Sequence, residues 1–131
     1  MTNESPQGTP IHVLFVDDEE EIVRLAARLL DRRGFMTTGH VDPSEALKEF
    51  GAAPDRFDIV AADTFMPAMS GFELALQLRS IRPGIPILLM SGALGAEETE
   101  RGRALGVHEF LSKPYSAEQL AAAVTRALRD A

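Results

Sequence analysis

The sequence predicts a single α/β domain with a mostly parallel sheet of five strands and helices on both of its faces. Short apolar runs alternate with helical patterns along the chain, and parallel strands require crossover connections of this kind, which are right-handed. Residues 85–90 are apolar throughout, which is typical of a strand that is buried on both faces. The 131 residues, 45% of them hydrophobic, suit one globular domain with a real core.

The elements follow one another from residue 11 onward. Residues 1–10 are polar and rich in Pro, Gly, Ser and Thr, so we expect a flexible tail or linker there and the domain over residues 11–131. Strands are expected at residues 11–16, 35–41, 57–62, 85–90 and 108–111, the second of them weak and at an edge. Helices are expected at residues 19–33, 42–51, from 70 onward, 94–105 and 116–129.

Capping residues mark several of these helix boundaries. Asp42 is followed by proline and, three residues on, by Glu45, which is a helix-start pattern. Ser70 and Ser116 each precede a Glu or Gln by three residues and are expected to cap the third and fifth helices. Gly34 is expected to end the first helix.

Composition and charge exclude several classes of function. The formal net charge of -7 argues against direct nucleic-acid binding, which depends on Lys and Arg, and favours cations or basic protein surfaces as partners. The absence of cysteine excludes a disulfide framework and fits a cytoplasmic protein. The longest apolar run, residues 85–90, is too short to cross a bilayer, so no membrane insertion is expected.

The residues with reactive side chains come at the ends of the predicted strands. Asp17 and Asp18 follow the first strand, Asp63 the third, Ser91 the fourth and Lys113 the fifth. In a doubly wound sheet the ligand site lies outside the carboxyl ends of the strands. Carboxylates that converge there would repel one another, so we expect a hard divalent cation, Mg²⁺. Asp63 is then a candidate nucleophile toward a phosphoryl group whose oxygens bind Ser91 and Lys113.

Each of these residues also has a plain structural interpretation. The acidic pair and the three glutamates after it could simply favour the positive end of a helix. A lone Ser91 or Lys113 would be solvated surface, and it is their coincidence with Asp63 that favours a site. The three histidines have no metal-ligand spacing and are expected to be structural: His12, His40 and His108.

Four short motifs together resemble the receiver domain of two-component response regulators. They are Asp17-Asp18-Glu19, Asp63 with Met66-Pro67 and Gly71, Ser91-Gly92, and Lys113-Pro114. The resemblance covers about residues 11–131. It implies a flavodoxin-like (βα)5 fold with strand order 2-1-3-4-5. It also implies a signalling function, in which a histidine kinase or histidine phosphotransfer protein donates a phosphoryl group from a phosphohistidine.

The resemblance assigns roles around the acids. Asp63 would be the phosphoacceptor and a metal ligand, Asp18 a direct Mg²⁺ ligand, and Asp17 a ligand mostly through water. The backbone carbonyl of Phe65 would complete the protein ligands. Phe65 and Ala93 stand where a polar side chain could orient a hydrolytic water, and neither can do so, so we expect slow self-dephosphorylation.

Further roles concern the response to phosphorylation. Ser91 and Lys113 would bind the phosphoryl group, and Ser91 and Phe110 would form the switch, although an aromatic in a strand is often plain core. The Lys113–Pro114 bond is expected to be cis. The output surface toward a downstream protein partner would be the fourth helix, the fifth strand and the fifth helix.

Other functions are compatible with parts of the pattern. A phosphatase of the haloacid dehalogenase type resembles a pattern with a second Asp two residues after the first, where this chain has Phe65. A flavin module would require a hydroxyl-rich loop after the first strand. A receiver-like interaction scaffold remains an alternative. The chain ends one helix after Lys113, so we expect no separate catalytic or DNA-binding output domain: either a stand-alone receiver, or one from a longer protein such as a hybrid histidine kinase.

Overall fold

The computed structural model describes residue 4 and residues 8–129 of the chain, and its strands form one sheet. The strand order is β2-β1-β3-β4-β5 and every pair is parallel, as the sequence predicted. The strands are β1 His12–Val16, β2 Met36–His40, β3 Ile59–Asp63, β4 Ile87–Ser91 and β5 Glu109–Ser112. The prediction that the second strand lies at an edge is confirmed.

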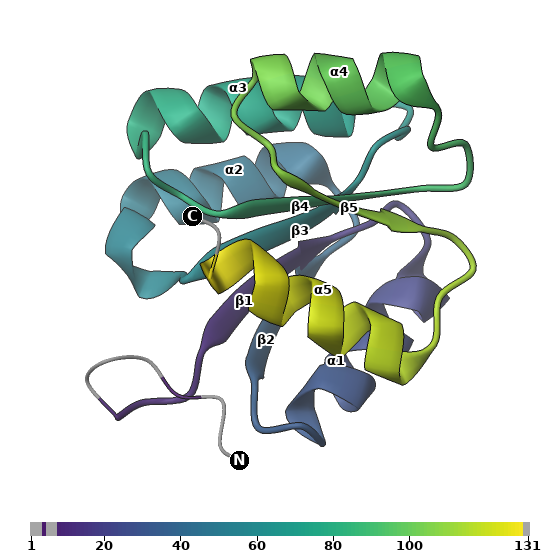
Figure 1. Cartoon of the computed structure of the whole chain (residues 1–131). Coiled ribbons are helices and arrows are strands. Elements are labelled where there is room, and N and C mark those ends of the chain that lie inside the picture. Colours follow the sequence, from purple (N-terminus) through teal and green to yellow (C-terminus); the bar gives the residue numbers. More distant parts are fainter. Residues whose placement is uncertain (1–3, 5–7, 130–131) are drawn as a thin grey trace.

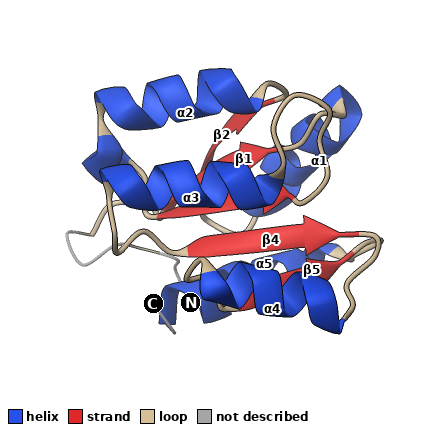
Figure 2. Cartoon of the chain, turned by 90° about the horizontal axis from the view of Figure 1, so that it is seen from above, coloured by secondary structure: helices blue, strands red, loops and turns tan. Residues whose placement is uncertain are grey.

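Helices cover both faces of this sheet. They are α1 Glu20–Asp31, α2 Pro43–Ala52, α3 Gly71–Ile81, α4 Ala96–Ala104 and α5 Ala117–Arg129, with a short 3-10 helix, η1 Pro54–Arg56. Figure 1 shows α1 and α5 on one face and α2, α3 and α4 on the other, and Figure 2 shows the same layers from above. None of the helices in the described part of the chain has the length and hydropathy needed to span a membrane.

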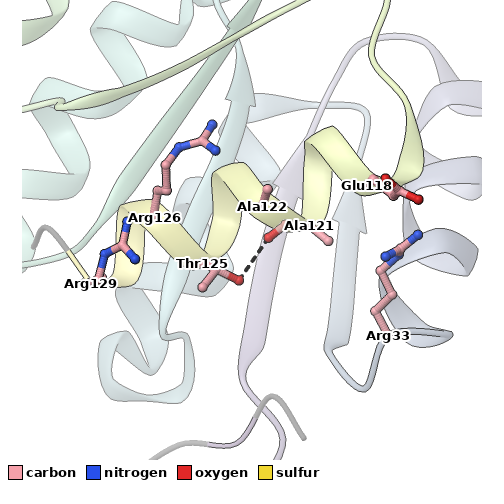
Figure 3. A pocket seen from close by; sticks show the side chains of 7 residues that line it. All are labelled: Arg33, Glu118, Ala121, Ala122, Thr125, Arg126 and Arg129. Atoms are coloured by element: carbon pink, nitrogen blue, oxygen red, sulfur yellow. Dashed lines mark hydrogen bonds between the residues drawn. The ribbon is translucent and has the colours of Figure 1, made fainter. Parts of the chain in front are cut away.

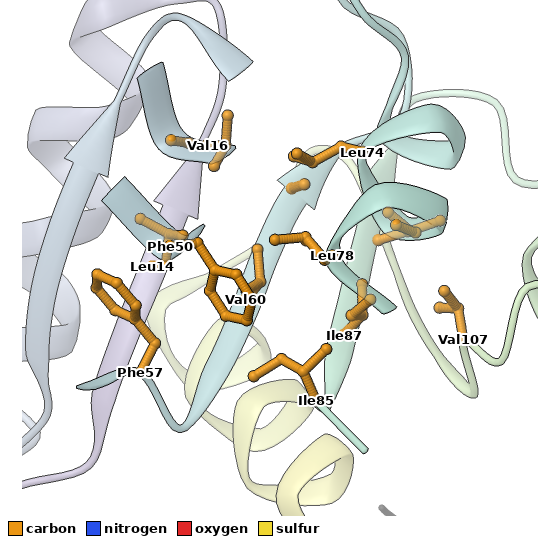
Figure 4. Packing of buried hydrophobic residues seen from close by; sticks show 14 of the residues in the cluster. Leu14, Val16, Phe50, Phe57, Val60, Leu74, Leu78, Ile85, Ile87 and Val107 are labelled. Atoms are coloured by element: carbon orange, nitrogen blue, oxygen red, sulfur yellow. The ribbon is translucent and has the colours of Figure 1, made fainter. Parts of the chain in front are cut away.

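The core consists of two apolar clusters, one on each face of the sheet. All five residues of β1 are buried, and successive side chains of a strand point to opposite faces. Leu14 and Val16 therefore pack with α2 and α3 (Figure 4), whereas Val13 and Phe15 pack with α1 and α5. This two-sided burial explains why the central strands read as continuous apolar runs.

The predicted capping residues begin their helices as expected. The side chains of Asp42, Ser70 and Ser116 each accept a hydrogen bond from a backbone N–H two or three residues later. Such bonds satisfy donors that the first turn of a helix leaves free. Gly34 ends the turn after α1 with a φ of 88°, a backbone conformation that favours glycine.

Several predicted boundaries were wrong by one or two residues. β4 begins at Ile87 and not at residue 85, because Pro86 has no N–H group to donate to the ladder. β3 includes Asp63, whose register partner is Met90. α4 begins at residue 96, where the N–H group of Gly95 donates to the Glu98 side chain. The helix η1 was not predicted.

The predicted tail lies mostly outside the described residues. Within residues 1–10 the structure describes Glu4 and residues 8–10, and Glu4 pairs with Pro10 in an isolated antiparallel bridge. Residues 130–131, at the end of the predicted domain, also lie outside the described part.

Candidate functional site

Three carboxylates gather at the carboxyl edge of the sheet. Asp17 and Asp18 follow β1 and Asp63 ends β3, and one oxygen from each lies within 4.8 Å of the other two. Asp17 and Asp63 are buried, whereas Asp18 is exposed. Like charges at such a spacing repel one another, so this set of oxygen ligands suits a hard divalent cation.

The ammonium group of Lys113 lies between two of these acids. Its Nζ atom is 2.8 Å from Asp17 Oδ2 and 3.3 Å from Asp63 Oδ1. The shorter contact is therefore to Asp17, although the opposite preference would be expected of a lysine dedicated to Asp63. The backbone N–H of Lys113 donates to the carbonyl of Ser91 at 2.9 Å, and the Lys113–Pro114 peptide bond is cis.

The environment shifts two of these groups in the same direction. Burial raises the pKa of Asp63, and the charge of Asp17 adds to the effect while Lys113 opposes it. Burial alone would lower the pKa of Lys113, but its hydrogen bond to Asp17 and the two acidic charges raise it above its usual value. Lys113 thus stays an ammonium, and the Asp63 carboxylate is held in its charged form at a cost.

Ser91 lies at the end of β4, within the core rather than on the surface. It is fully buried, and its Oγ accepts a hydrogen bond from the N–H of Ala93 at 3.0 Å. Thr64, directly after Asp63, is buried as well and donates its hydroxyl to the carbonyl of Met90 at 2.9 Å. The bonds of Thr64 to Met90 fix the ends of β3 and β4 side by side, so that Asp63 and Ser91 lie at the same edge of the sheet.

The loop after Asp63 returns to the end of β3 at Gly71. The N–H of Gly71 donates to the carbonyl of Thr64 at 2.7 Å. A Cβ atom added at Gly71 would lie 2.5 Å from the carbonyl oxygen of Asp63 and 2.9 Å from the Cα of Thr64. Only glycine allows α3 to begin this close to the phosphoacceptor candidate.

Two of the other predicted site residues are aromatic. Phe65 is 56% exposed, and its ring centroid is 6.4 Å from that of Phe72 in α3. The role of the Phe65 carbonyl as a metal ligand stays a prediction. Phe110 in β5 is half-buried and packs against the core under α4. Its ring fits there because Gly102 has no side chain: a Cβ on Gly102 would lie 2.6 Å from two ring carbons.

Two hollows over the described residues are not lined by the three acids, whereas a third, of about 230 Å³, includes Asp18 beside Met66 and Pro67. One hollow, of about 600 Å³, lies along α5 and is lined by Arg33, Glu118, Ala121, Ala122, Thr125, Arg126 and Arg129 (Figure 3). A second, of about 460 Å³, runs between α1 and the start of α5 and includes Lys113 and Tyr115. Burial raises the pKa of Tyr115 to about 12, so this phenol stays neutral. We place the functional site by the acids, since an aspartyl acceptor needs access and not a deep cavity.

The family model of the response regulator receiver domain matches residues 13–125. The chain belongs to this family. The receiver domain is 33% identical over 122 residues to the probable transcriptional regulatory protein TcrX of Mycobacterium tuberculosis, covering 93% of this chain and 51% of TcrX. It is 37% identical over 117 residues to the sensory transduction protein RegX3 of Mycobacterium bovis, covering 89% of this chain and 50% of RegX3. The chain thus spans about half the length of the curated relatives it matches.

Solved structures agree with this assignment. The receiver domain superposes on the chemotaxis protein CheY4 of Vibrio cholerae with a TM-score of 0.86 at 32% identity, over 92% of this chain and 100% of CheY4. A chain of the CheX-CheY-BeF3-Mg+2 complex from Borrelia burgdorferi gives a TM-score of 0.87 at 22% identity, covering 95% and 94%, and shows the fold alone. The predicted family, fold and signalling class are therefore confirmed.

Some residues of this receiver domain were not anticipated from the sequence. They are Thr64, Arg101 and Gly102, which contact the site or its surroundings. The sequence carried a signal for Gly102 alone, because a glycine inside a helix lowers stability and often marks a close approach. Two histidines are structural, as predicted: His12 bonds to Thr38, and His40 to Glu49.

We predict that Gly71→Ala destabilises the receiver domain, because its methyl group would meet backbone atoms of β3 that cannot move aside. The expected loss in the free energy of unfolding is about 2 kcal/mol, measured by urea denaturation. Gly84→Ala is the matched control, since a Cβ there has no neighbour within 4 Å. Equal stability of the two variants would contradict the close approach.

We also predict that Asp63→Asn stabilises the receiver domain at pH 7 by about 1 kcal/mol. The raised pKa of Asp63 means that the folded state disfavours the carboxylate, and an amide removes that charge while keeping the shape. The gain should shrink as the pH falls through the raised pKa, because the wild-type acid then becomes neutral too. Urea unfolding at several pH values measures it, with exposed Asp55→Asn as the control; a less stable Asp63→Asn at pH 7 would refute it.

Proposed function

We propose that this receiver domain transfers a phosphoryl group from a phosphohistidine donor onto a carboxylate oxygen of Asp63, with Mg²⁺ as cofactor. The observation that carries the proposal is the cluster of Asp17, Asp18 and Asp63, with one oxygen of each within 4.8 Å of the others and with Lys113 against two of them. A site that opposes three acids with one lysine retains negative charge, and a divalent cation would neutralise it.

The three acids would have different roles. Asp18 is exposed and free to bind the ion directly. Both oxygens of Asp17 already accept hydrogen bonds, one from Lys113 and one from the N–H of Glu19 at 2.9 Å, which supports contact with the ion through water. Asp63 and the carbonyl of Phe65 would complete the ligands.

In the transfer step the P–N bond of the phosphohistidine breaks and a P–O bond to Asp63 forms. The imidazole leaves with the bonding electron pair and takes up a proton. Bound Mg²⁺ would supply charge neutralisation on the phosphoryl oxygens. Lys113, held as an ammonium, would bind a second oxygen, and the Ser91 hydroxyl, which accepts from the N–H of Ala93 and keeps its own proton, would donate to a third.

The partners follow from this chemistry. The donor would be a histidine kinase or a histidine phosphotransfer protein, and the domain would act in the cytoplasm. The downstream protein would bind the face formed by α4, β5 and α5, with Ser91 and Phe110 as the switch. Phe110 precedes Lys113 by three residues in the chain and packs against Gly102 of α4, which supports this route.

We predict that Mg²⁺ with acetyl phosphate adds one phosphate to the chain, on Asp63. An acyl phosphate is stable in acid and labile in base, and intact-mass spectra before and after mild base treatment measure it. Asp63→Asn should show no such mass shift, whereas Asp55→Asn, an exposed aspartate, should show it in full. An unchanged shift in Asp63→Asn would assign the phosphate to another residue.

We further predict that the phosphorylated domain loses phosphate slowly, over many minutes or longer. Hydrolysis requires a water in line with phosphorus, and neither Phe65 nor Ala93, both exposed beside the site, can orient one. Phosphate release is to be followed in Mg²⁺ for the wild type and for Phe65→Glu with Ala93→Asn, which should be faster by about tenfold or more.

Phe65→Leu separates orientation from shielding, because leucine is apolar but lacks the ring. It should stay close to the slow wild type if water orientation sets the rate. Loss of phosphate from the wild type within seconds, or no acceleration in the double variant, would show that these two positions do not control the lifetime.

A further inference from the structure

Helix α4 is loosely attached to the rest of the domain. Its sequence is AEETERGRA, and its single buried residue is Gly102. α3, the neighbouring helix on the same face, buries five residues: Gly71, Phe72, Leu74, Ala75 and Leu78. The backbone of α4 also has only sparse contacts with other elements. A helix that buries so little apolar surface depends on a few individual contacts for its position.

Two adjacent residues of α4 supply such contacts, and each rests on an aromatic ring. Gly102 packs against one end of the Phe110 ring in β5, where a Cβ would lie 2.6 Å from two ring carbons. The guanidinium carbon of Arg101 lies 4.2 Å from the ring centroid of Phe72 in α3, which is the geometry of a cation–π contact. The contact of Gly102 therefore joins α4 to β5, the strand before Lys113, whereas the contact of Arg101, the second anchor, joins α4 to α3.

The second anchor leads to the loop that follows Asp63. Phe72 comes directly after Gly71, whose backbone touches the end of β3. Although it lies in the first turn of a surface helix, Phe72 is only 2% exposed. The edge-to-face contact with Phe65 joins it to the residue two positions after Asp63. The rings of Phe65 and Phe72 thus connect the loop to Arg101.

We propose that Arg101 is a positioning residue, which couples α4 to the loop after Asp63 through the ring of Phe72, separately from the connection through Lys113 and Phe110. The proposal rests on phosphorylation of Asp63 as its input. If a change of charge at Asp63 moves the loop, the ring of Phe72 that Arg101 contacts would move as well, and the position of α4 would change. By linkage, a change in the position of α4 would also alter the conformation of the loop. A hollow of about 230 Å³ between α3 and α4, lined in part by Leu76 and Leu105, leaves room for such movement.

The test compares Arg101→Gln with Arg103→Gln in the full chain. Both changes remove one positive charge from the last turn of α4, and both arginines are exposed, but Arg101 is the one against Phe72. Backbone amide NMR shifts are recorded before and after phosphorylation with acetyl phosphate and Mg²⁺. In Arg101→Gln the shift changes of residues 96–104 should fall about twofold or more, whereas those of β5 and all those of Arg103→Gln should match the wild type.

Phe72→Leu supplies the second arm, since it keeps apolar bulk in the core and removes the ring. It should cause the same loss at residues 96–104, and adding Arg101→Gln to it should cause no more. Arg101→Lys, which keeps a cation, should recover part of the response. A full response in Arg101→Gln, an equal loss in Arg103→Gln, or additive losses in the double variant would overturn the proposal.

Amide hydrogen exchange separates this inference from the proposed function. If the wild type takes up no phosphate, the proposed function fails, but exchange in α4 still tests the anchor: it should be about two- to fivefold faster in Arg101→Gln than in Arg103→Gln. If phosphate is taken up and exchange in α4 is equal in the two variants, the anchor itself is wrong. If exchange differs but the shift response does not, Arg101 only fastens the helix and the coupling is overturned.

Discussion

The ammonium group of Lys113 lies between two acids at the carboxyl ends of β1 and β3, which pair side by side in the sheet. It contacts Asp17 after β1 and Asp63 at the end of β3, and its own backbone bonds to Ser91 at the end of β4. Two buried carboxylates could not be kept this close without a cation between them. One lysine does not balance three acids, however, so the edge of the sheet stays negatively charged and ready for a divalent ion and a phosphoryl group.

Two glycines allow helices to pack closely around this cluster, because they have no side chain. Gly71 lets α3 begin against the backbone of Asp63, and Gly102 lets α4 lie on the ring of Phe110. The contact of Gly71 is between backbone atoms and is rigid, whereas the contact of Gly102 is with the end of the Phe110 side chain, which can rotate. The start of α3 is therefore fixed against the end of β3, whereas the contact between α4 and β5 can adjust.

The sequence was sufficient for the parallel sheet and for the acids, because strand ends in a parallel sheet share one edge and apolar runs reveal buried strands. The strand order followed from the resemblance to receiver domains. The sequence was insufficient where the outcome depends on contacts between distant segments. Nothing in the order of residues indicates that Lys113 bonds more closely to Asp17 than to Asp63, or that Arg101 covers Phe72. Gly102 was the exception, since a glycine inside a helix is already a hint of close approach.

The domain combines a disfavoured charge at Asp63 with a loosely held helix, α4. Burial and neighbouring acids disfavour the Asp63 carboxylate, while α4 buries a single residue and rests on two rings. Allosteric couplings are typically about 1–3 kcal/mol. This free energy is small beside the packing of α3, but it is comparable with the two contacts of α4, the cation–π contact of Arg101 and the packing of Gly102 against the Phe110 ring. A change of charge at Asp63 that reaches Arg101 can therefore shift α4 without disturbing the sheet, because the described contacts that hold α4 are comparable in strength with such a coupling.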